Sequence, residues 1–218
     1  IDPTIREDIR YATANNFTGA PLPGYYRGAC ILRRAAAMAL KRVQADLMAR
    51  KPPLSLKVFD CYRPVRAVKA MVRWSKRKTN RDLKQLYFPN IAKRDLFSSG
   101  YISARSTHST GSTVDLSIVN VSREAILAAS VSKGSKKTCI NSGRDQNDPS
   151  AMDMGTAYDC FDVKSHTWTG GLNATQVFNR KTLVNAMNRQ GFSNYRREWW
   201  HFTHQPSRSK RMFNVPVH

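Results

Sequence analysis

The sequence lacks several features that would assign it to a class of protein at once. It has no run approaching the roughly 18 consecutive apolar residues that cross a bilayer, which argues against a transmembrane segment. None of its four cysteines has the Cys-x-x-Cys spacing of a zinc ribbon or a thiol redox site. There is no internal repeat and no low-complexity tract. An ordinary hydrophobic fraction of 41% over 218 residues instead predicts one domain with a sizeable core.

Acidic residues are scarce. The chain has 15 aspartates and glutamates against 36 lysines and arginines, a formal net charge of +21. Such a charge attracts polyanions, so nucleic acid, anionic membrane surfaces and anionic cell-wall polymers are candidate partners. The alternative is a diffuse, solvated charge without a partner. No basic run alternates with aromatic residues as a single-strand binding groove would, so we expect no specific nucleic acid and favour anionic cell-wall polymers.

The four cysteines, Cys30, Cys61, Cys139 and Cys160, are an even number without metal-ligand spacing. They allow two disulfides, in one of three connectivities, and the alternative is four buried thiols in a cytosolic protein. We expect Cys139–Cys160, because both belong to one loop region. We expect Cys30–Cys61, because the first helix must pack near the first strand. Disulfides imply an oxidising compartment, so the expected location is periplasmic or secreted, with the cytoplasm as the alternative.

The spacing of apolar residues predicts a mixture of helices and strands. Helices are predicted at 29–50, from Pro64 to about Lys78, and at 175–190. Strands are predicted at 54–61 and 113–119, with a final strand or hairpin at 192–202. Residues 79–100 have a mixed pattern, which predicts short helical turns.

The strand at 113–119 has one polar face, which carries Thr113, Asp115 and Ser117. A polar face on a strand inside a domain suggests a functional site there. Helices and strands do not alternate regularly, so we expect an α+β fold. The expected architecture is a single domain, 1–218, with a small central antiparallel sheet flanked by helices. Residues 120–151 contain a short helical stretch and then mainly Gly, Ser, Lys, Asn and Asp, which predicts an inserted surface loop.

Three segments contain the side chains that a metallohydrolase needs. They are 106–115 (STHSTGSTVD), 198–202 (EWWHF) and 60–64 (DCYRP). A catalytic zinc has three protein ligands and keeps a fourth position for water. Zinc lowers the pKa of that water to about 7, and a nearby carboxylate can take its proton. The His-x6-Asp spacing of the first segment is weak by itself, since a core histidine and a capping aspartate give the same pattern.

Together the three segments resemble a known family. Ser-x-His-x-x-Gly-x-x-x-Asp, then Glu-Trp-Trp-His, with a preceding Tyr-Arg-Pro, is the pattern of the D-alanyl-D-alanine dipeptidases of the VanX type, within a wider group of zinc D,D-peptidases. All three motifs occur here in that order. Further similarity lies in Tyr11–Gly19, Gly24–Tyr25, Tyr87–Ile91, Gly100–Tyr101 and Met154–Asp159. The resemblance therefore runs from about residue 10 to residue 203.

The resemblance implies the catalytic residues. His108, Asp115 and His201 would hold one zinc ion per chain, on the sheet. Glu198 would be the general base for the metal-bound water and then the general acid for the leaving amine. In a regular strand, residues three apart point to opposite faces, so Glu198 and His201 can face one metal only across a turn or bulge.

The resemblance also implies how substrate is bound. Arg63 would bind the carbonyl oxygen as it becomes an oxyanion, a role suited to an always-charged guanidinium. Asp159 would hold the ammonium group of the substrate, and Ser106 its carboxylate. The alternatives are a structural salt bridge for Arg63, a surface loop aspartate for Asp159 and turn hydrogen bonding for Ser106. The implied function is zinc-dependent hydrolysis of D-alanyl-D-alanine to two D-alanines.

Two other functions remain open. A D,D-carboxypeptidase or endopeptidase of the same fold, trimming peptidoglycan stem peptides, would need an open groove instead of a closed pocket. An inactive basic module that binds cell wall or nucleic acid would not need the complete set of metal ligands. This chain also departs from the family, because its 120–151 segment is longer than in compact members. In addition, Cys30 and Cys61 replace apolar or small residues of cytosolic members. His and carboxylate ligands would also accept cobalt, nickel or iron.

Overall fold

The computed structural model describes residues 2–123, 138–141, 148 and 150–218. Its centre is a five-stranded sheet with the order β1-β2-β3-β5-β4. The strands are β1 (Arg6–Glu7), β2 (Leu54–Asp60), β3 (Thr113–Asn120), β4 (Phe192–Asn194) and β5 (His201–His204). Neighbours pair antiparallel except β1, which runs parallel to β2. The predicted α+β class is confirmed, but the sheet is mixed at this edge, where a two-residue strand offers no periodicity to read.

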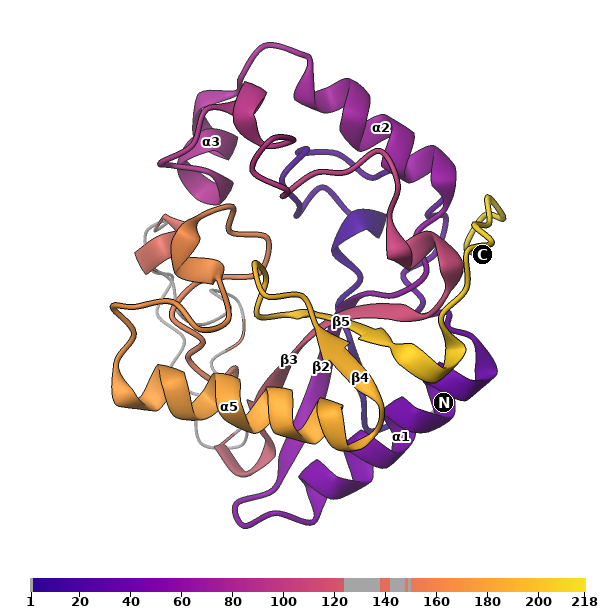
Figure 1. Cartoon of the computed structure of the whole chain (residues 1–218), viewed down its shortest axis with the longest axis vertical. Coiled ribbons are helices and arrows are strands. Elements are labelled where there is room, and N and C mark those ends of the chain that lie inside the picture. Colours follow the sequence, from indigo (N-terminus) through magenta and orange to yellow (C-terminus); the bar gives the residue numbers. More distant parts are fainter. Residues whose placement is uncertain (1, 124–137, 142–147, 149) are drawn as a thin grey trace.

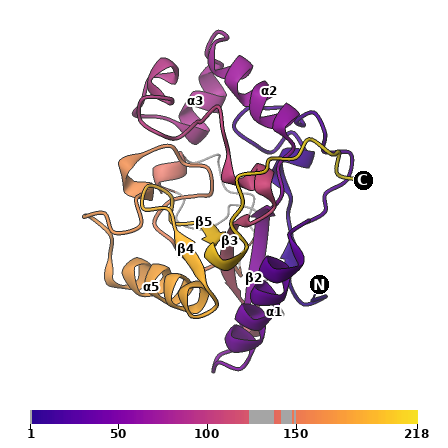
Figure 2. The ribbon, with the colours of Figure 1, turned by 45° about the vertical axis from the view of Figure 1, so that its right-hand side comes forward.

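Four α-helices lie in the described residues: α1 (Arg34–Met48), α2 (Val65–Ser75), α3 (Arg81–Tyr87) and α5 (Ala174–Arg189). Helices α1 and α5 contact each other, and they pack on the sheet at β2 and β4 respectively (Figure 1). Helices α2 and α3 belong to the half of the molecule farthest from α1 and α5 (Figure 2). None of the described helices is long and apolar enough to cross a membrane.

The face of the sheet toward α1 is apolar. Cross-strand partners lie on the same face, and Leu56 pairs with Ile118 while Val58 pairs with Leu116. All four side chains are fully buried in the main core, together with Leu40, Val43 and Leu47 of α1. Because side chains alternate along a strand, the opposite face of β3 is left to Asp115 and Ser117.

The register of the sheet brings three polar residues side by side on that opposite face. A register irregularity between Val58 and Asp60 lets Asp60 pair with Asp115. Asp115 in turn pairs with His201 of β5. Strands β2, β3 and β5 therefore supply three adjacent polar side chains from segments far apart in the sequence.

The first helix begins later than apolar spacing predicts. Helix α1 starts only at Arg34, because the residues before it run alongside the end of β2. There the backbone N–H of Tyr62 donates to the carbonyl of Ile31 at 3.0 Å, and Cys30 is bonded to Cys61. The segment from 29 to 33 is thus fixed by tertiary contacts that helix periodicity does not reveal.

Both expected disulfides, Cys30–Cys61 and Cys139–Cys160, are present. Most of the predicted 120–151 loop, with its short helical stretch at 124–130, lies outside the described residues. Of its described part, Cys139–Asn141 forms one 3-10 turn. A single domain with an inserted loop stays a prediction.

Candidate metal centre and substrate pocket

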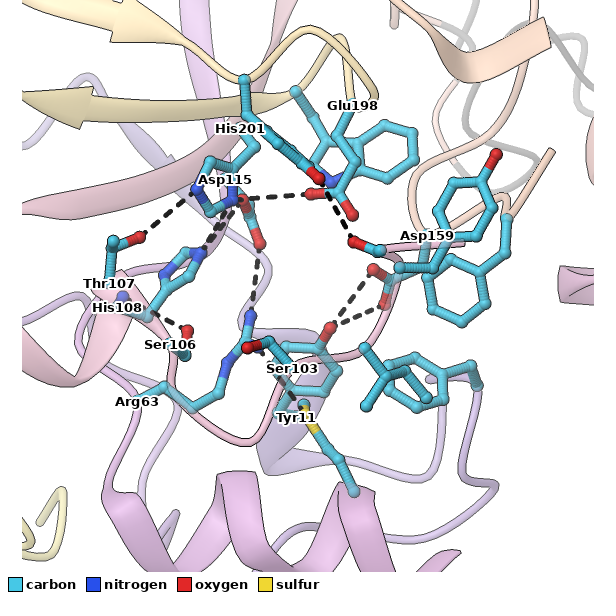
Figure 3. Close-up of a pocket in the computed structure, with 18 of the residues that line it drawn as sticks. Tyr11, Arg63, Ser103, Ser106, Thr107, His108, Asp115, Asp159, Glu198 and His201 are labelled. Atoms are coloured by element: carbon cyan, nitrogen blue, oxygen red, sulfur yellow. Dashed lines mark hydrogen bonds and ion pairs between the residues drawn. The ribbon is translucent and has the colours of Figure 1, made fainter. Parts of the chain in front are cut away.

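A pocket of about 250 Å³ opens on the polar face of the sheet. All seven residues singled out from the sequence line it: Arg63, Ser106, His108, Asp115, Asp159, Glu198 and His201 (Figure 3). They come from the segment after β2, the turn before β3, β3 itself, the loop just before Cys160, and the turn into β5. The pocket is smaller than the roughly 300–1,000 Å³ of sites for drug-sized ligands, which favours a small molecule.

His108, Asp115 and His201 converge on one point. His108 Nε2 lies 3.2 Å from His201 Nδ1 and 3.2 Å from Asp115 Oδ1, and His201 Nδ1 lies 3.0 Å from Asp115 Oδ1. Ligands about 2.0–2.2 Å from one tetrahedral ion are about 3.3–3.6 Å apart, slightly wider than this triangle. Within the described part of the chain, these three side chains lie close enough together to hold one metal ion.

The tautomer of His108 is fixed by the backbone. Its Nδ1 lies 2.6 Å from the carbonyl oxygen of Cys61, which can only accept, so Nδ1 carries the proton. Nε2 therefore presents a lone pair to the other two ligands. His108 sits on a 3-10 turn, Thr107–Thr110, which ends at Gly111 with φ of 75°, a left-handed conformation that favours glycine.

The donor set fits a cation. Asp115 Oδ1 is buried and accepts no hydrogen bond within the described residues, although His108 Nε2 and His201 Nδ1 lie 3.2 and 3.0 Å from it. Burial would raise the pKa of Asp115, but the imidazoles of His108 and His201 hold that pKa well below its usual range. An ionised oxygen and a nitrogen lone pair facing each other without a proton repel, and a bound metal ion removes that repulsion.

Glu198 reaches the same place through a turn. The backbone N–H of His201 donates to the carbonyl of Glu198 at 3.2 Å, and residues 199–200 are a turn, not a strand. The expected break between Glu198 and His201 is therefore confirmed. Glu198 Oε2 lies 3.5 Å from His201 Nδ1. Burial, reinforced by the negative charges of Asp115 and Asp159, raises the pKa of Glu198 well above its usual value.

Arg63 is held over the pocket by three groups. Its Nε donates to Asp60 Oδ2 at 2.8 Å, and its second terminal nitrogen lies 3.4 Å from Asp115 Oδ2. Its guanidinium carbon stands 4.7 Å from the ring centre of Tyr11. The salt bridge at a strand end thus exists, and the same contacts aim the guanidinium into the pocket.

Asp159 is buried with a hydroxyl as its partner. Tyr11 Oη donates to both carboxylate oxygens, at 2.9 and 3.2 Å, and no ion pair joins Asp159 to a lysine or arginine of the described chain. Its φ of 59° is unusual for a residue with a side chain. Burial, followed by the charge of Asp115, raises the pKa of Asp159 to about 8. A buried acid that forms no ion pair within the described residues suits a site that receives a positively charged group.

Ser106 faces the pocket, but its hydroxyl has a local partner. Ser106 Oγ accepts from the backbone N–H of His108 at 3.3 Å and caps the 3-10 turn. Turn hydrogen bonding, the alternative considered for this serine, is therefore present. Thr107, the next residue, also lines the pocket, and its hydroxyl lies 3.5 Å from His201 Nε2.

Sequence reasoning missed the tyrosines that connect these groups. Tyr158 Oη donates to Asp115 Oδ2 at 3.1 Å and lies 3.4 Å from Tyr11 Oη, so the two tyrosine hydroxyls lie between Asp115 and Asp159. Asp60 was also missed, although it orients Arg63 and accepts from Tyr25 Oη at 2.6 Å. Their position in the sequence could have revealed them, because Tyr11 and Asp60 lie inside the motifs that resemble the family. Neither residue was given a role there.

Comparison with known proteins agrees with this geometry. A family model described as D-Ala-D-Ala dipeptidase, of the peptidase M15 group, matches residues 1–129 and 120–218. The chain is 32% identical to a D-alanyl-D-alanine dipeptidase of Enterococcus faecalis, over 91% of this chain and 85% of that protein. It is 33% identical to one of Streptomyces coelicolor and 30% identical to one of Enterococcus faecium, with the same coverage. The chain therefore belongs to the peptidase M15 family of D-Ala-D-Ala dipeptidases.

Proposed function

We propose that this protein hydrolyses D-alanyl-D-alanine to two D-alanines with one zinc ion, held by His108, Asp115 and His201. The observation that carries the proposal is the triangle of their ligand atoms, 3.0 to 3.2 Å on each side, at the floor of a small pocket. When bound, zinc would polarise the scissile carbonyl and acidify the attacking water.

Glu198 is proposed as the base and then the acid. Its carboxylate takes a proton from the attacking water and delivers it to the amine nitrogen as the peptide bond breaks. The position beside His201, within 3.5 Å of Nδ1, supports this role. Burial supports it further, because a carboxylate with a raised pKa is a better proton acceptor than an exposed one.

The remaining polar groups are proposed to bind the dipeptide along its length. Arg63 donates to the carbonyl oxygen as negative charge develops there. Asp159 takes the ammonium group at one end, and Ser106 with neighbouring backbone amides takes the carboxylate at the other. In this arrangement the ammonium group of the dipeptide meets the anion Asp159. Its carboxylate meets the hydrogen-bond donors near Ser106, on the other side of the metal ligands.

One experiment tests the metal and the base together. Purified protein is assayed for zinc content and for hydrolysis of D-Ala-D-Ala, with Glu198→Ala, His108→Ala and Asp95→Asn as variants. We expect Glu198→Ala to keep about one zinc per chain and to lose roughly 100-fold or more in kcat. His108→Ala should lose the metal, and Asp95→Asn, a control at a half-exposed side chain outside the pocket, should match wild type. Full zinc occupancy in His108→Ala, or wild-type turnover in zinc-loaded Glu198→Ala, would refute the assignment.

We also propose a compartment and a second partner. Two disulfides favour an oxidising compartment, periplasmic or extracellular. The net charge of +21 favours attraction to anionic cell-wall polymers, and one feature of the surface supports that partner. A hollow of about 550 Å³ is lined by Lys76, Arg77, Lys78, Lys93 and Arg94 and by no acidic residue of the described chain.

A further inference from the structure

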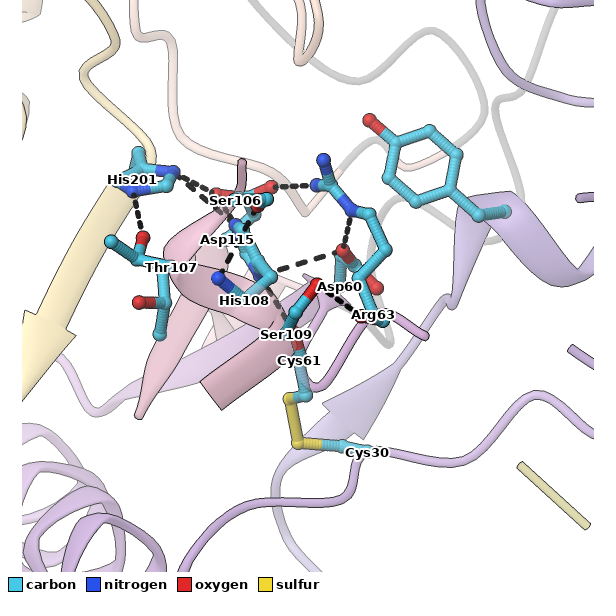
Figure 4. Close-up of polar contacts among 12 residues, drawn as sticks. Cys30, Asp60, Cys61, Arg63, Ser106, Thr107, His108, Ser109, Asp115 and His201 are labelled. Carbon is cyan, nitrogen blue, oxygen red and sulfur yellow. Dashed lines mark hydrogen bonds and ion pairs between the residues drawn. A yellow bond between two sulfur atoms is a disulfide. The ribbon is translucent and has the colours of Figure 1, made fainter. Parts of the chain in front are cut away.

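The Cys30–Cys61 disulfide lies next to the metal ligand His108, on the side away from Asp115 and His201 (Figure 4). Cys61 is the residue whose carbonyl oxygen accepts the proton of His108 Nδ1, at 2.6 Å. We infer that this disulfide is a positioning element of the metal centre: it holds the Cys61 carbonyl against His108 and thereby keeps Nε2 aimed at the metal. The inference rests on the proposed function and adds to it a pair of residues that touch neither metal nor substrate.

Cys61 needs such an anchor because the sheet ends before it. Strand β2 stops at Asp60, so Cys61 lies outside the ladder of backbone hydrogen bonds. The next residue, Tyr62, donates its N–H to the carbonyl of Ile31, the neighbour of Cys30. The disulfide and this hydrogen bond therefore join the same two stretches of chain at adjacent residues.

The stretch that contains Cys30 also contacts the turn that carries His108. The backbone N–H of Arg33 donates to the carbonyl of Gly111 at 2.8 Å, and Arg33 Nε donates to the carbonyl of Thr110 at 2.8 Å. The turn is linked back to the segment after Cys61, because Ser109 Oγ donates to the carbonyl of Arg63 at 2.8 Å. Each of three segments thus contacts the other two around the metal ligand His108: residues 30–33, 61–63 and 108–111.

The same segment also carries Arg63, so the disulfide constrains two functional groups at once. Arg63 lies two residues after Cys61, and its backbone N–H donates to the carbonyl of His108 at 3.3 Å. A displacement of Cys61 would move the carbonyl that fixes the tautomer of His108 and the backbone that orients Arg63. Groups that orient metal ligands in this way typically change metal affinity 10- to 100-fold when removed.

The second disulfide provides a matched control. Cys139–Cys160 closes a loop of similar length, with sequence separations of 21 against 31, so its effect on the entropy of the unfolded chain is similar. Cys160 adjoins Asp159, not a metal ligand. Loss of either disulfide should lower Tm, whereas only loss of Cys30–Cys61 should weaken metal binding.

The test measures zinc affinity by competition with a chromophoric chelator, beside Tm and the kinetics of D-Ala-D-Ala hydrolysis. We expect Cys30→Ala/Cys61→Ala to bind zinc about 10-fold to 100-fold more weakly than wild type. We expect Cys139→Ala/Cys160→Ala to keep its zinc affinity within about 3-fold and to show a raised KM, because that bond braces the loop of Asp159. Arg33→Met keeps the disulfide but loses the donor to Thr110, and it should weaken zinc binding several-fold even if the alanine pair does not fold.

The outcomes separate this inference from the proposed function. Unchanged zinc affinity in both Cys30→Ala/Cys61→Ala and Arg33→Met overturns the positioning role, and so does an equal loss in the two disulfide variants. If His108→Ala also retains zinc at full affinity, the metal assignment itself fails. Loss of zinc in His108→Ala, with unchanged zinc affinity in the disulfide variants, would support the proposed function and overturn the positioning role of the disulfide.

Discussion

Asp159 combines three uncommon properties in one residue. It is buried, it adopts a left-handed backbone conformation, and among the described side chains it accepts a hydrogen bond from the hydroxyl of Tyr11 alone. A non-glycine residue in that conformation costs on the order of 1 kcal/mol or more, and such strain clusters at functional sites. The local cost is tolerable if the residue is held ready for a ligand that supplies the missing positive charge.

The first prediction concerns the ammonium group of the substrate. Wild-type enzyme should cleave N-acetyl-D-Ala-D-Ala far more slowly than D-Ala-D-Ala, because acylation removes the charge that Asp159 would pair with and adds bulk there. An unpaired buried group costs about 1–3 kcal/mol, which corresponds to about 5- to 150-fold in kcat/KM. Asp159→Asn should lower kcat/KM for the free dipeptide and narrow the gap between the two compounds.

Steady-state kinetics on both compounds, with Asp95→Asn as a surface control, checks this expectation. Equal cleavage of the two compounds by wild type would contradict the dipeptidase assignment. The stem-peptide-trimming alternative would then take its place, since a peptidoglycan stem has no free ammonium at that position.

A second prediction concerns stability and pH. The pKa of Asp159 is about 8 in the folded protein, against about 3.9 for an unfolded aspartate. The folded state therefore binds more protons between these values, so ionisation of Asp159 makes stability fall as pH rises from about 4 to about 8. In chelator-treated protein, Asp159→Asn should have a higher Tm than wild type at pH 8, and the difference should vanish near pH 4. A constant difference across that range would show that the side chain does not titrate as described.

At the level of residues, the sequence located the functional groups better than it located their supports. The seven motif residues do meet in one pocket, because the motifs contain the groups themselves. Tyr11 and Asp60 contact them through long-range pairings: the hydroxyl of Tyr11 bonds a residue 148 positions later. No local spacing encodes a contact of that range.

The turn between Glu198 and His201 is the element on which the site depends most. Asn194 of β4 braces it, because its side-chain amide donates to the carbonyls of Glu198 at 3.0 Å and His201 at 3.1 Å. Its side-chain oxygen accepts from Thr167 Oγ1 at 2.5 Å. His201 is also fixed by the ladder to Asp115, whereas Glu198 lies outside any strand.

The third prediction follows from that asymmetry. Asn194→Ala should lower kcat by about 10- to 100-fold, because a misplacement of about 1 Å at a reacting group has an effect of this size. Zinc content should stay near one per chain, since the ladder still holds His201. Asn185→Ala, an exposed asparagine on α5, serves as the control in kinetics and metal analysis. Loss of zinc in parallel with activity would mean that Asn194 supports the metal ligand instead of the base.

Long elements were predictable and short ones were not. The helices α1, α2 and α5 and the strands β2 and β3 match the predicted ranges to within a few residues, because apolar periodicity over seven or more residues reflects one buried face. Strand β1 has only two residues and therefore shows no periodicity. Its parallel pairing with β2 depends on the path of the chain between the two strands, which includes α1. The break between Glu198 and His201 was predictable only because chemistry required both side chains at one point.

At the scale of the whole molecule, the charge is not spread evenly. The segment 61–106, about a fifth of the chain, has twelve lysines and arginines against two aspartates. It carries α2 and α3, in the half of the molecule away from α1 and α5 (Figure 1). Lys93 Nζ donates to the carbonyls of Arg77 and Lys78, which ties together the two sides of the basic hollow. The exposed cations around the hollow are thereby held close to one another despite their repulsion.

The last prediction concerns this basic surface and a polymer with a phosphodiester backbone. Each lysine or arginine near an anionic surface is worth roughly 1 kcal/mol, so reversing two of them should weaken binding at least tenfold. Lys76→Glu/Lys78→Glu should therefore lose affinity for poly(glycerol phosphate) chains, whereas Lys41→Glu/Lys181→Glu, an equal charge change on α1 and α5, should stay within about threefold of wild type. Binding is measured at low and moderate salt, because attraction between exposed charges is screened by salt. Hydrolysis of the free dipeptide should be the same in both variants, since none of the four lysines lines the catalytic pocket. Equal losses in the two pairs would show that the charge acts diffusely over the whole molecule, with no docking site at the hollow.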